Sequence, residues 1–303
     1  MPTVSDRHAR LDMRSRALMS IRRFFTERDY VEVETPVRIE TPALELHIDA
    51  EPSGDRYLRT SPELHMKRLL AAGYERIFQM GPCFRAGEQG ALHHPEYTML
   101  EWYRAEADYE TILADLQALL RHVVHAVTGG SRIHWHGYTV DVDGDWAIES
   151  VQAVFQQWAG WDPVVAFDAD RFDIDLVERI EPRLKECTVP CILKDYPAPA
   201  AALARCRSDN PVVAERWECY MAGIELANAY SELNDPAEQQ ARFAACAEAR
   251  RQAGLTVYPL DTAFLESLAA MPSSGGIALG FDRLAMLCAG VPTIADVTAF
   301  QEC

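Results

Sequence analysis

Two pairs of strand-like segments with short connections constrain the fold of this 303-residue chain more than any other feature. Residues 76–85 and 96–105 are rich in aliphatic and aromatic side chains and are separated by a glycine-containing loop. Residues 214–223 and 224–233 have the same character and follow one another directly at an Ala-Gly pair. Strands joined by such short connections pair antiparallel, whereas parallel strands need a long crossover. The sequence therefore predicts an α+β protein with an antiparallel sheet flanked by helices.

Helical periodicity and stop signals account for most of the remaining chain. Apolar residues recur at helical spacing from Asp108 to Gly129, and Asp235 begins a capping box with proline at the first helical position. We expect one domain over residues 1–303, with a peripheral insertion at about 130–190, where the pattern is mixed. The other expected elements are helices at 6–28, from Ser61 to near Gly73, 147–159, 170–186, 235–254 and 282–290, the last capped by Asp282, and strands at 30–36, 189–197 and 275–281.

Charge and composition exclude several classes of function. The formal net charge of −17 disfavours broad contact with a nucleic-acid backbone and suits a basic partner. No apolar run approaches the roughly 20 residues of a membrane span, and the N-terminal residues are polar, so we expect a cytoplasmic protein. The eight cysteines are scattered apart from Cys187 and Cys191, which lack a second pair and therefore predict free thiols and not a zinc site.

Strand alternation gathers polar side chains on one face of the first hairpin. Tyr97, Met99, Glu101 and Tyr103 point to the same side of their strand. Arg85 ends the preceding strand and lies beside them. Each of these residues alone would be consistent with a surface ribbon that carries ordinary ion pairs, but together they place an acid, two phenols and a guanidinium side by side.

Two later segments add the features of a ligand site. The hairpin at 214–233 contains several acids, and burying them without cations would be costly. Residues 275–283 combine a glycine-rich strand with a helix start that carries Arg283 in its first turn. Glycines allow a ligand to approach the backbone, while a helix N-terminus and a guanidinium both favour an anion. Together with the first hairpin, these segments indicate an anion site beside a site for a cation.

These segments resemble the catalytic core of the class II aminoacyl-tRNA synthetases, and most of all the lysine enzymes. The three motifs of that family correspond to residues 14–36, 83–104 and 276–286. Residues 61–69 and 223–243 also resemble the lysine branch. The resemblance extends through most of the chain and is weakest in the expected insertion.

One departure from the lysine enzymes bears on the acceptor. Those enzymes carry an N-terminal anticodon-binding OB domain, whereas the first helix of this chain begins almost at Met1. In length and motifs the chain is similar to a stand-alone branch of the family that transfers (R)-β-lysine to a lysine side chain of translation elongation factor P. The resemblance therefore implies an ATP-dependent amino acid–protein ligase that has elongation factor P as its partner and does not bind a tRNA anticodon.

The resemblance also implies roles in ATP binding. Arg85 would hold the α-phosphate and Arg283 the γ-phosphate, because positioning and electrostatics supply most of the rate in adenylate formation. Residues 84–88 depart from the usual Phe-Arg-Asn-Glu by shifting the acid one position, and a histidine replaces the usual asparagine at position 94. By the same resemblance, Gly280 would allow the nucleotide to approach the backbone closely, and Glu88 and His94 would border the nucleotide. Glu218 and Glu225 would bind the Mg²⁺ that accompanies ATP.

A lysine-type substrate with two cations would account for the remaining acids. By the resemblance, Glu232 and Tyr103 would hold its terminal ammonium, and Glu63 and Glu101 would lie nearer the reacting end. The set is completed by Ser61, Asn228, Tyr230 and Ala278, the last at a position where lysine synthetases usually have glycine. Local sequence alone leaves other roles open: a capping box with Thr60 for Glu63, core packing for Tyr230 and Ala278, and a turn for Asn228.

Strict alternation conflicts with this assignment at one point. It places Glu225 on the face opposite Asn228, Tyr230 and Glu232, although the family gathers all four around one site. The sequence therefore predicts a bulge or kink near residues 227–229.

Three hypotheses follow for function. The leading one is a ligase acting on elongation factor P. A truncated lysyl-tRNA synthetase, or an amino-acid-activating enzyme for another carrier, is the second, and a catalytically silent synthetase-like regulator is the third. The retained Arg85, Glu218, Glu225 and Arg283 argue against silence, because a pure binding module has no use for an ATP·Mg²⁺ site. The first motif, in which Pro36 ends a strand, is where such enzymes dimerise, so a homodimer with twofold symmetry is expected.

Overall fold

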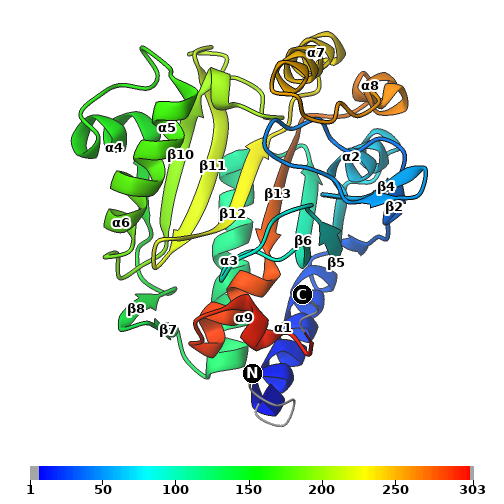
Figure 1. Cartoon of the computed structure of the whole chain (residues 1–303). Coiled ribbons are helices and arrows are strands. Elements are labelled where there is room, and N and C mark those ends of the chain that lie inside the picture. The colour runs from blue at the N-terminus through cyan, green and yellow to red at the C-terminus, as the bar shows by residue number, and fades with distance from the viewer. Residues whose placement is uncertain (1–6, 301–303) are drawn as a thin grey trace.

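An eight-stranded sheet organises the protein (Figure 1), whose computed structural model describes residues 7–300. The strand order is β1-β5-β6-β13-β12-β11-β10-β9. Neighbouring strands are antiparallel except at the two edges, where β1 runs parallel to β5 and β9 parallel to β10. The α+β class with a mainly antiparallel sheet is therefore confirmed. The strands are β1 (Val31–Glu32), β5 (Arg76–Phe84), β6 (Glu96–Ala105), β9 (Ala147–Ser150), β10 (Cys191–Pro197), β11 (Val213–Met221), β12 (Ile224–Ser231) and β13 (Ser274–Gly280).

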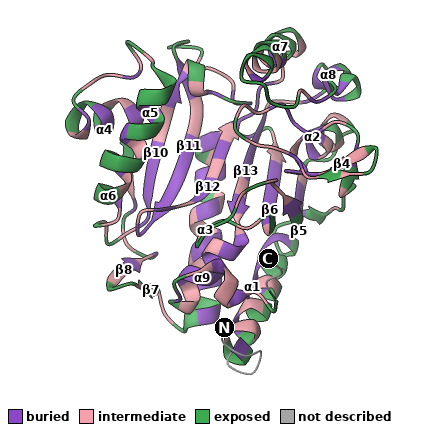
Figure 2. Ribbon diagram, in the orientation of Figure 1, coloured by how far each residue is buried: buried purple, intermediate pink, exposed green. Residues whose placement is uncertain are grey.

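One face of the sheet packs against α1 (His8–Thr26), α3 (Tyr109–Thr128) and α9 (Phe281–Ala289). The helix α3 has the boundaries that its sequence predicts: Asp108 caps it by accepting a hydrogen bond from the Thr111 backbone N–H, and Gly129 ends it with a φ of 77°. The large apolar core under these helices is buried (Figure 2), and Phe25 of α1 stacks on Phe78 of β5 within it.

The opposite face is covered only toward its two sides. On one side lie α2 (Glu63–Ala71), α7 (Pro236–Gln252) and α8 (Thr262–Leu268), and on the other α4 (Val151–Trp158), α5 (Ala169–Asp175) and α6 (Glu181–Leu184), each group with its own apolar cluster. In Figure 1 these two groups flank the central strands β6, β13 and β12. The smaller elements are the strands β2 (Arg38–Ile39), β3 (Pro52–Ser53), β4 (Arg56–Leu58), β7 (Arg132–Trp135) and β8 (Tyr138–Asp141), a π-helical turn at Leu176–Ile180 and 3₁₀ turns at Ala198–Ala200 and Ile294–Val297.

Residues 1–6 and 301–303 lie outside the described residues. The two ends of the expected 1–303 domain and the first residue of the helix expected at 6–28 therefore also lie outside them. The peripheral insertion at about 130–190 stays a prediction. None of the helices in the described part of the chain is both long enough and apolar enough to cross a membrane.

Three local expectations are wrong. The strand expected at 30–36, with Pro36 at its end, spans only Val31–Glu32. Residues 147–150, expected to begin a helix, form the edge strand β9, because their backbone pairs with β10 before Ser150 caps α4. Asp282 does not cap α9, because that helix already begins at Phe281. The Asp282 carboxylate instead accepts a hydrogen bond of 2.7 Å from the Thr98 backbone N–H and pairs with Arg14 at 2.6 Å, which ties α9 to β6 and α1.

The strand β12 contains the irregularity that the sequence requires. Cys219 of β11 pairs with Ala227, whereas Tyr220 pairs with Glu225, so Leu226 is an extra residue in β12. This bulge lies one residue before the predicted position. Because one extra residue reverses the alternation of side chains, Glu225 comes to the same face as the later polar residues of the strand.

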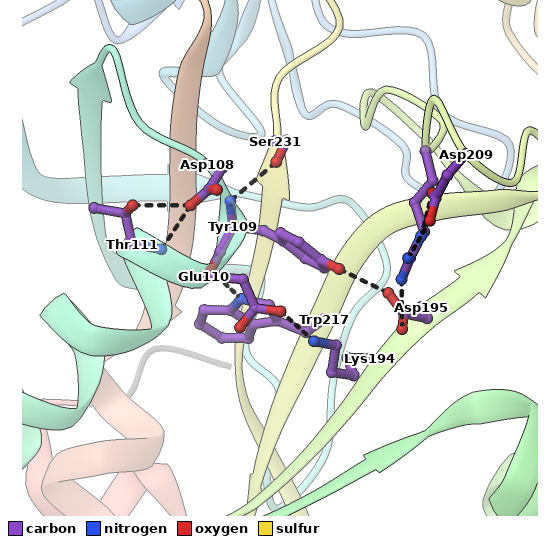
Figure 3. A network of polar contacts seen from close by, with 10 residues as sticks. Asp108, Tyr109, Glu110, Thr111, Lys194, Asp195, Asp209, Trp217 and Ser231 are labelled. Carbon is purple, nitrogen blue, oxygen red and sulfur yellow. Dashed lines mark hydrogen bonds and ion pairs between the residues drawn. The ribbon is translucent and has the colours of Figure 1, made fainter.

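A polar network fixes the end of β12 against the start of α3 (Figure 3). The Ser231 hydroxyl accepts a 2.9 Å hydrogen bond from the Tyr109 backbone N–H, and the Tyr109 carbonyl accepts one of 2.7 Å from the Trp217 indole. The Tyr109 hydroxyl donates to Asp195, at the irregular position of β10. Since Ser231 is held on this face of the sheet, Glu232 next to it is directed to the opposite face.

Candidate active site

A cleft of about 210 Å³ opens on the sheet face that lies between the two groups of helices. Strands β6, β12 and β13 form its floor, and the loop after β5 forms one wall. Every residue that the sequence assigns to the site lines this cleft, except Glu218: Ser61, Glu63, Arg85, Glu88, His94, Glu101, Tyr103, Glu225, Asn228, Tyr230, Glu232, Ala278, Gly280 and Arg283. The fold thus brings four distant segments of sequence around one cavity.

Arg85 lies at one end of the cleft. Its guanidinium stacks on the Tyr97 ring, 5.3 Å from the ring centroid, and its Nη1 is 3.4 Å from Glu88. Its Nε is buried and has no hydrogen-bond partner among residues 7–300. Burial alone would lower the pKa of Arg85, but the surrounding acidic groups raise it above its ordinary value, so the side chain is a cation with a donor to spare.

Arg283 lies at the same end and holds the neighbouring loop. It donates hydrogen bonds to the backbone carbonyls of Glu225 (2.6 Å) and Leu92 (3.3 Å). Its Nη2 is 2.7 Å from the His93 Nε2, and burial together with the charge of Arg283 lowers the pKa of that imidazole. His93 is therefore a neutral acceptor here. Arg85 and Arg283 thus give this end of the cleft two guanidinium groups, which lie among the acids Glu45, Glu88 and Glu225.

Two glycines of β13 serve different purposes. A Cβ on Gly276 would lie 2.1 Å from Oε1 of Glu232 and 2.4 Å from the Tyr103 ring, so only glycine lets these two side chains meet over the strand. A Cβ on Gly280 would meet nothing nearer than the Arg283 Cδ at 3.6 Å, and the φ of Gly280 is −72°. The packing of the chain itself therefore does not require glycine at position 280.

Glu101 lies at the other end of the cleft and, like Glu232, has only 1% of its surface exposed. Its two oxygens accept hydrogen bonds from the Ser61 hydroxyl (2.7 Å) and the Tyr103 hydroxyl (2.8 Å). Burial and the charge of Glu63 raise the pKa of Glu101 to about 8. At neutral pH this carboxyl group therefore holds a proton in most molecules of the free protein.

Glu63 and Glu232 share a buried lysine at this end. The Lys67 Nζ is 2.5 Å from Oε1 of Glu63 and 2.5 Å from Oε2 of Glu232. The capping box that was considered for Glu63 is absent: α2 begins after Pro62 without a side-chain cap, and the Glu63 backbone N–H donates to Ser61 and not to Thr60. Glu63 is thus free to turn its carboxylate toward Lys67.

Glu218 of β11 pairs with Asn228 and lies beside the cleft on the same face of the sheet, where its carboxylate already has three donors. Its Oε1 is 2.5 Å from the Arg216 Nη2, and its Oε2 accepts 2.6 Å hydrogen bonds from the hydroxyls of Tyr196 and Tyr220. Arg216 also donates to Asn228, which in turn donates to the Tyr230 hydroxyl at 2.9 Å. The cleft residues of β12 are therefore oriented by a guanidinium from the neighbouring strand.

The sequence analysis missed four residues at or beside the cleft: Glu45, Lys67, His93 and Arg216. Lys67 follows Glu63 by four residues, the helical spacing of an ion pair, so its signal was present. Glu45 lies in an irregular loop without periodicity, and no local pattern indicates that it reaches the cleft.

Comparisons with known proteins identify the family of the chain. A family model of the class II tRNA synthetases (D, K and N) matches residues 3–302. The elongation factor P–(R)-β-lysine ligase of Vibrio cholerae is 39% identical and covers 99% of this chain and 97% of its own length. The ligases of the same name from Histophilus somni (37% identical, 95% and 93% covered) and Proteus mirabilis (36%, 96% and 94%) are similar over comparable lengths. The chain therefore belongs to the class II tRNA synthetase family of the aspartate, lysine and asparagine type.

Proposed function

We propose that the protein is an ATP-dependent ligase that activates (R)-β-lysine as an adenylate and joins it to a lysine side chain of elongation factor P. The observation that carries the proposal is the set of relatives with that printed name, which are 36% to 39% identical and align with 95% to 99% of this chain. The two ends of the cleft suit the two substrates, since one end carries two arginines and the other a cluster of three glutamates. Because its acceptor is a translation factor, we place the enzyme in the cytoplasm.

The end of the cleft with Arg85 and Arg283 is the proposed ATP site. Arg85 offers a buried N–H without a partner to the α-phosphate, and Arg283 faces the γ-phosphate after giving up its contacts with the loop. Glu88 and His94 border the nucleotide. The absence of a packing requirement at Gly280 supports its role in admitting the nucleotide close to the backbone.

Mg²⁺ fits this end only when ATP supplies part of its coordination. Within residues 7–300, no group of three or more His, Cys, Asp or Glu side chains is placed to hold a metal ion alone. Glu225 lines the cleft with 41% of its side chain exposed, so it can offer a carboxylate oxygen. Glu218 accepts from three donors, which leaves about one lone-pair position, on Oε1, for a role as a second ligand. Mg²⁺ commonly binds one or two carboxylates together with phosphate oxygens and water, and it would neutralise charge on the phosphates.

The acidic end is the proposed amino-acid site. Glu232 and Tyr103, which meet over Gly276, would hold the terminal ammonium of the substrate. Glu63 and Glu101 would lie nearer its reacting end, with Ser61, Asn228, Tyr230 and Ala278 completing the wall. Ala278 lies on β13 between Glu101 of β6 and Asn228 of β12, so its methyl group is close to the polar groups that would read the substrate.

The reaction needs two displacements. An oxygen of the amino-acid carboxylate attacks the α-phosphorus, the bond from that phosphorus to the β-bridging oxygen breaks, and pyrophosphate leaves. The unprotonated amine of the acceptor lysine then attacks the carbonyl carbon, AMP leaves with the electrons of the broken bond, and the amine loses a proton to solvent. Arg85 faces the charge that develops on the α-phosphate, and such preorganised charge is the main source of rate in reactions of this type.

Two assays test the proposal. ATP–pyrophosphate exchange should occur with (R)-β-lysine and more weakly with α-lysine. Mass spectrometry of elongation factor P should then show the addition of one lysyl group after incubation with enzyme, ATP and (R)-β-lysine. Exchange without modification of elongation factor P would point to another carrier, and the absence of any exchange would point to a silent synthetase-like protein.

We further propose that the enzyme is a homodimer with twofold symmetry, formed through α1 and β1. In support, β1 is an edge strand, and Met19 of α1 and Val31 of β1 are large apolar side chains that are 69% and 48% exposed. A monomer whose mass does not change with concentration in sedimentation would contradict this assembly.

A further inference from the structure

Lys67 is the most deeply buried cation beside the amino-acid end of the cleft. It lies on α2 with none of its surface exposed, and it does not line the cleft. Its ammonium lies between Glu63, one helical turn earlier, and Glu232, just after β12, at 2.5 Å from each. A buried ammonium without counter-ions would be strongly destabilising, so the lysine and the two acids form one unit.

The two carboxylate oxygens of Glu232 have different surroundings in this unit. Lys67 contacts Oε2 of Glu232, whereas Oε1 of the same carboxylate lies over Gly276 beside the Tyr103 ring. Both Glu232 and Glu63 line the cleft, but their contact with Lys67 is on the side away from it. One oxygen of Glu232 is therefore used for anchoring, and the other is presented to a ligand.

The electrostatics of the unit depend on the lysine. Burial raises the pKa of Glu232 to about 7, and Lys67 is the main group that opposes this rise. Burial alone would lower the pKa of Lys67, but Glu232 and Glu63 raise it above its ordinary value, so the ammonium stays charged at neutral pH. The other ionisable groups that act on Glu232 or feel its charge are Glu63 of α2, Tyr103 of β6, Tyr230 of β12 and Arg205.

We propose that Lys67 is a positioning residue for the amino-acid substrate: a fixed internal counter-ion that keeps Glu232 ionised and turned so that one carboxylate oxygen meets the substrate ammonium. This inference rests on the proposed function, because it assumes that the acidic end of the cleft binds a lysine-type amino acid. It assigns a role to a residue that touches neither substrate.

The test is Lys67→Met, which keeps the length and burial of the side chain and removes its charge. Without the ammonium, the pKa of Glu232 should rise further, so less of this acid is ionised at neutral pH. If the rise is one to two units from about 7, the ionised fraction at pH 7 falls from half to between about one tenth and one hundredth. In pyrophosphate exchange the KM for the lysine substrate should therefore increase about 5- to 50-fold at pH 7, with the KM for ATP unchanged.

The pH profile distinguishes this role from a structural one. In the variant, the KM for the amino acid should fall back toward the wild-type value between pH 7 and pH 9, because Glu232 ionises as the pH passes its new, higher pKa. Arg68→Met is the matched control: it removes one charge from the next position of the same helix, where the side chain is exposed, and should change neither KM nor the profile. Lys67→Gln provides a second variant, since its amide still donates hydrogen bonds to the acids but carries no charge.

Three results would overturn the proposal. A folded Lys67→Met or Lys67→Gln variant with the wild-type KM and pH profile would show that the charge has no role in binding. A lower KM for the amino acid would show that Lys67 competes with the substrate for Glu232. An equal rise in the KM for both substrates at every pH would indicate general damage to the cleft. The wild-type enzyme distinguishes these results from failure of the proposed function, because that function fails if the wild type activates neither lysine isomer.

Discussion

Replacing Gly276 with alanine should damage recognition of the amino acid more than it damages the fold. The new methyl carbon would lie 2.1 Å from Oε1 of Glu232 and 2.4 Å from two carbons of the Tyr103 ring, whereas ordinary contacts begin at 3.4 Å. Both side chains, or the strand itself, must therefore move by about 1 Å. Neither moves easily, because Tyr103 and Glu232 are 3% and 1% exposed and Lys67 holds the far oxygen of Glu232.

The magnitude follows from this geometry. Overpacking of a tight site lowers the free energy of unfolding by about 1–3 kcal/mol. A displacement of about 1 Å in a substrate-positioning group costs about 100-fold in rate. Gly276→Ala should therefore reduce kcat/KM for the lysine substrate about 100-fold in pyrophosphate exchange while the protein remains folded, as checked by urea denaturation.

Gly280→Ala is the matched control within the same strand. A Cβ there would lie 3.6 Å from the nearest side-chain atom, so the free energy of unfolding should stay at the wild-type value. Any loss of activity in this variant should appear in the KM for ATP and not in that for the amino acid. If Gly276→Ala keeps the wild-type kcat/KM and stability, Glu232 and Tyr103 do not form the rigid pair described above, and the reasoning fails.

Three further predictions concern the nucleotide, the amino acid and the acceptor. Arg85→Ala and Arg283→Ala should each abolish adenylate formation in a folded protein, because each removes a cation facing phosphate charge; near-normal pyrophosphate exchange in either variant would remove that residue from its role. Ala278→Gly should raise kcat/KM for α-lysine relative to β-lysine, since a methyl-sized change in a tight pocket is worth about 10- to 200-fold, and an unchanged ratio would reject the steric account. Because the chain carries a net charge of −17, ligation to elongation factor P should weaken with salt more steeply than adenylation does, and equal salt sensitivity of the two steps would leave an electrostatically guided partner without support.

Much of the fold follows from patterns within single segments. The strands at 76–84 and 96–105 and the helix from Asp108 to Gly129 lie where alternation, periodicity and caps predict them. Local patterns did not predict the structure where contacts with a distant segment determine the local conformation. Residues 147–150 are extended because β10 offers them a backbone to pair with. Asp282 is recruited by Thr98 and Arg14, and nothing in its own neighbourhood of sequence indicates either partner.

The candidate site shows the same division. The motifs place Glu232 and Arg283 in one cleft, but the sequence does not say how their charges are balanced. Lys67 was overlooked because a lysine on a helix is usually solvated, and only the approach of β12 shows that this one is enclosed. For Glu218, Arg216 and Tyr220 lie in its own strand, but Tyr196 comes from β10, so the full set of donors on this carboxylate could not be predicted from its own segment.

The extra residue at Leu226 limits how this site can be redesigned. Glu225 and Glu232 are separated by an odd number of positions, and only the bulge between them lets both acids face the same cleft. Removing one residue at this point would leave a regular hairpin with ordinary pairing, yet it would turn Glu225 away from the face on which Glu232 lies. A changed substrate preference can therefore be sought through the size of individual side chains, whereas the length of this strand has no tolerance for insertion or deletion.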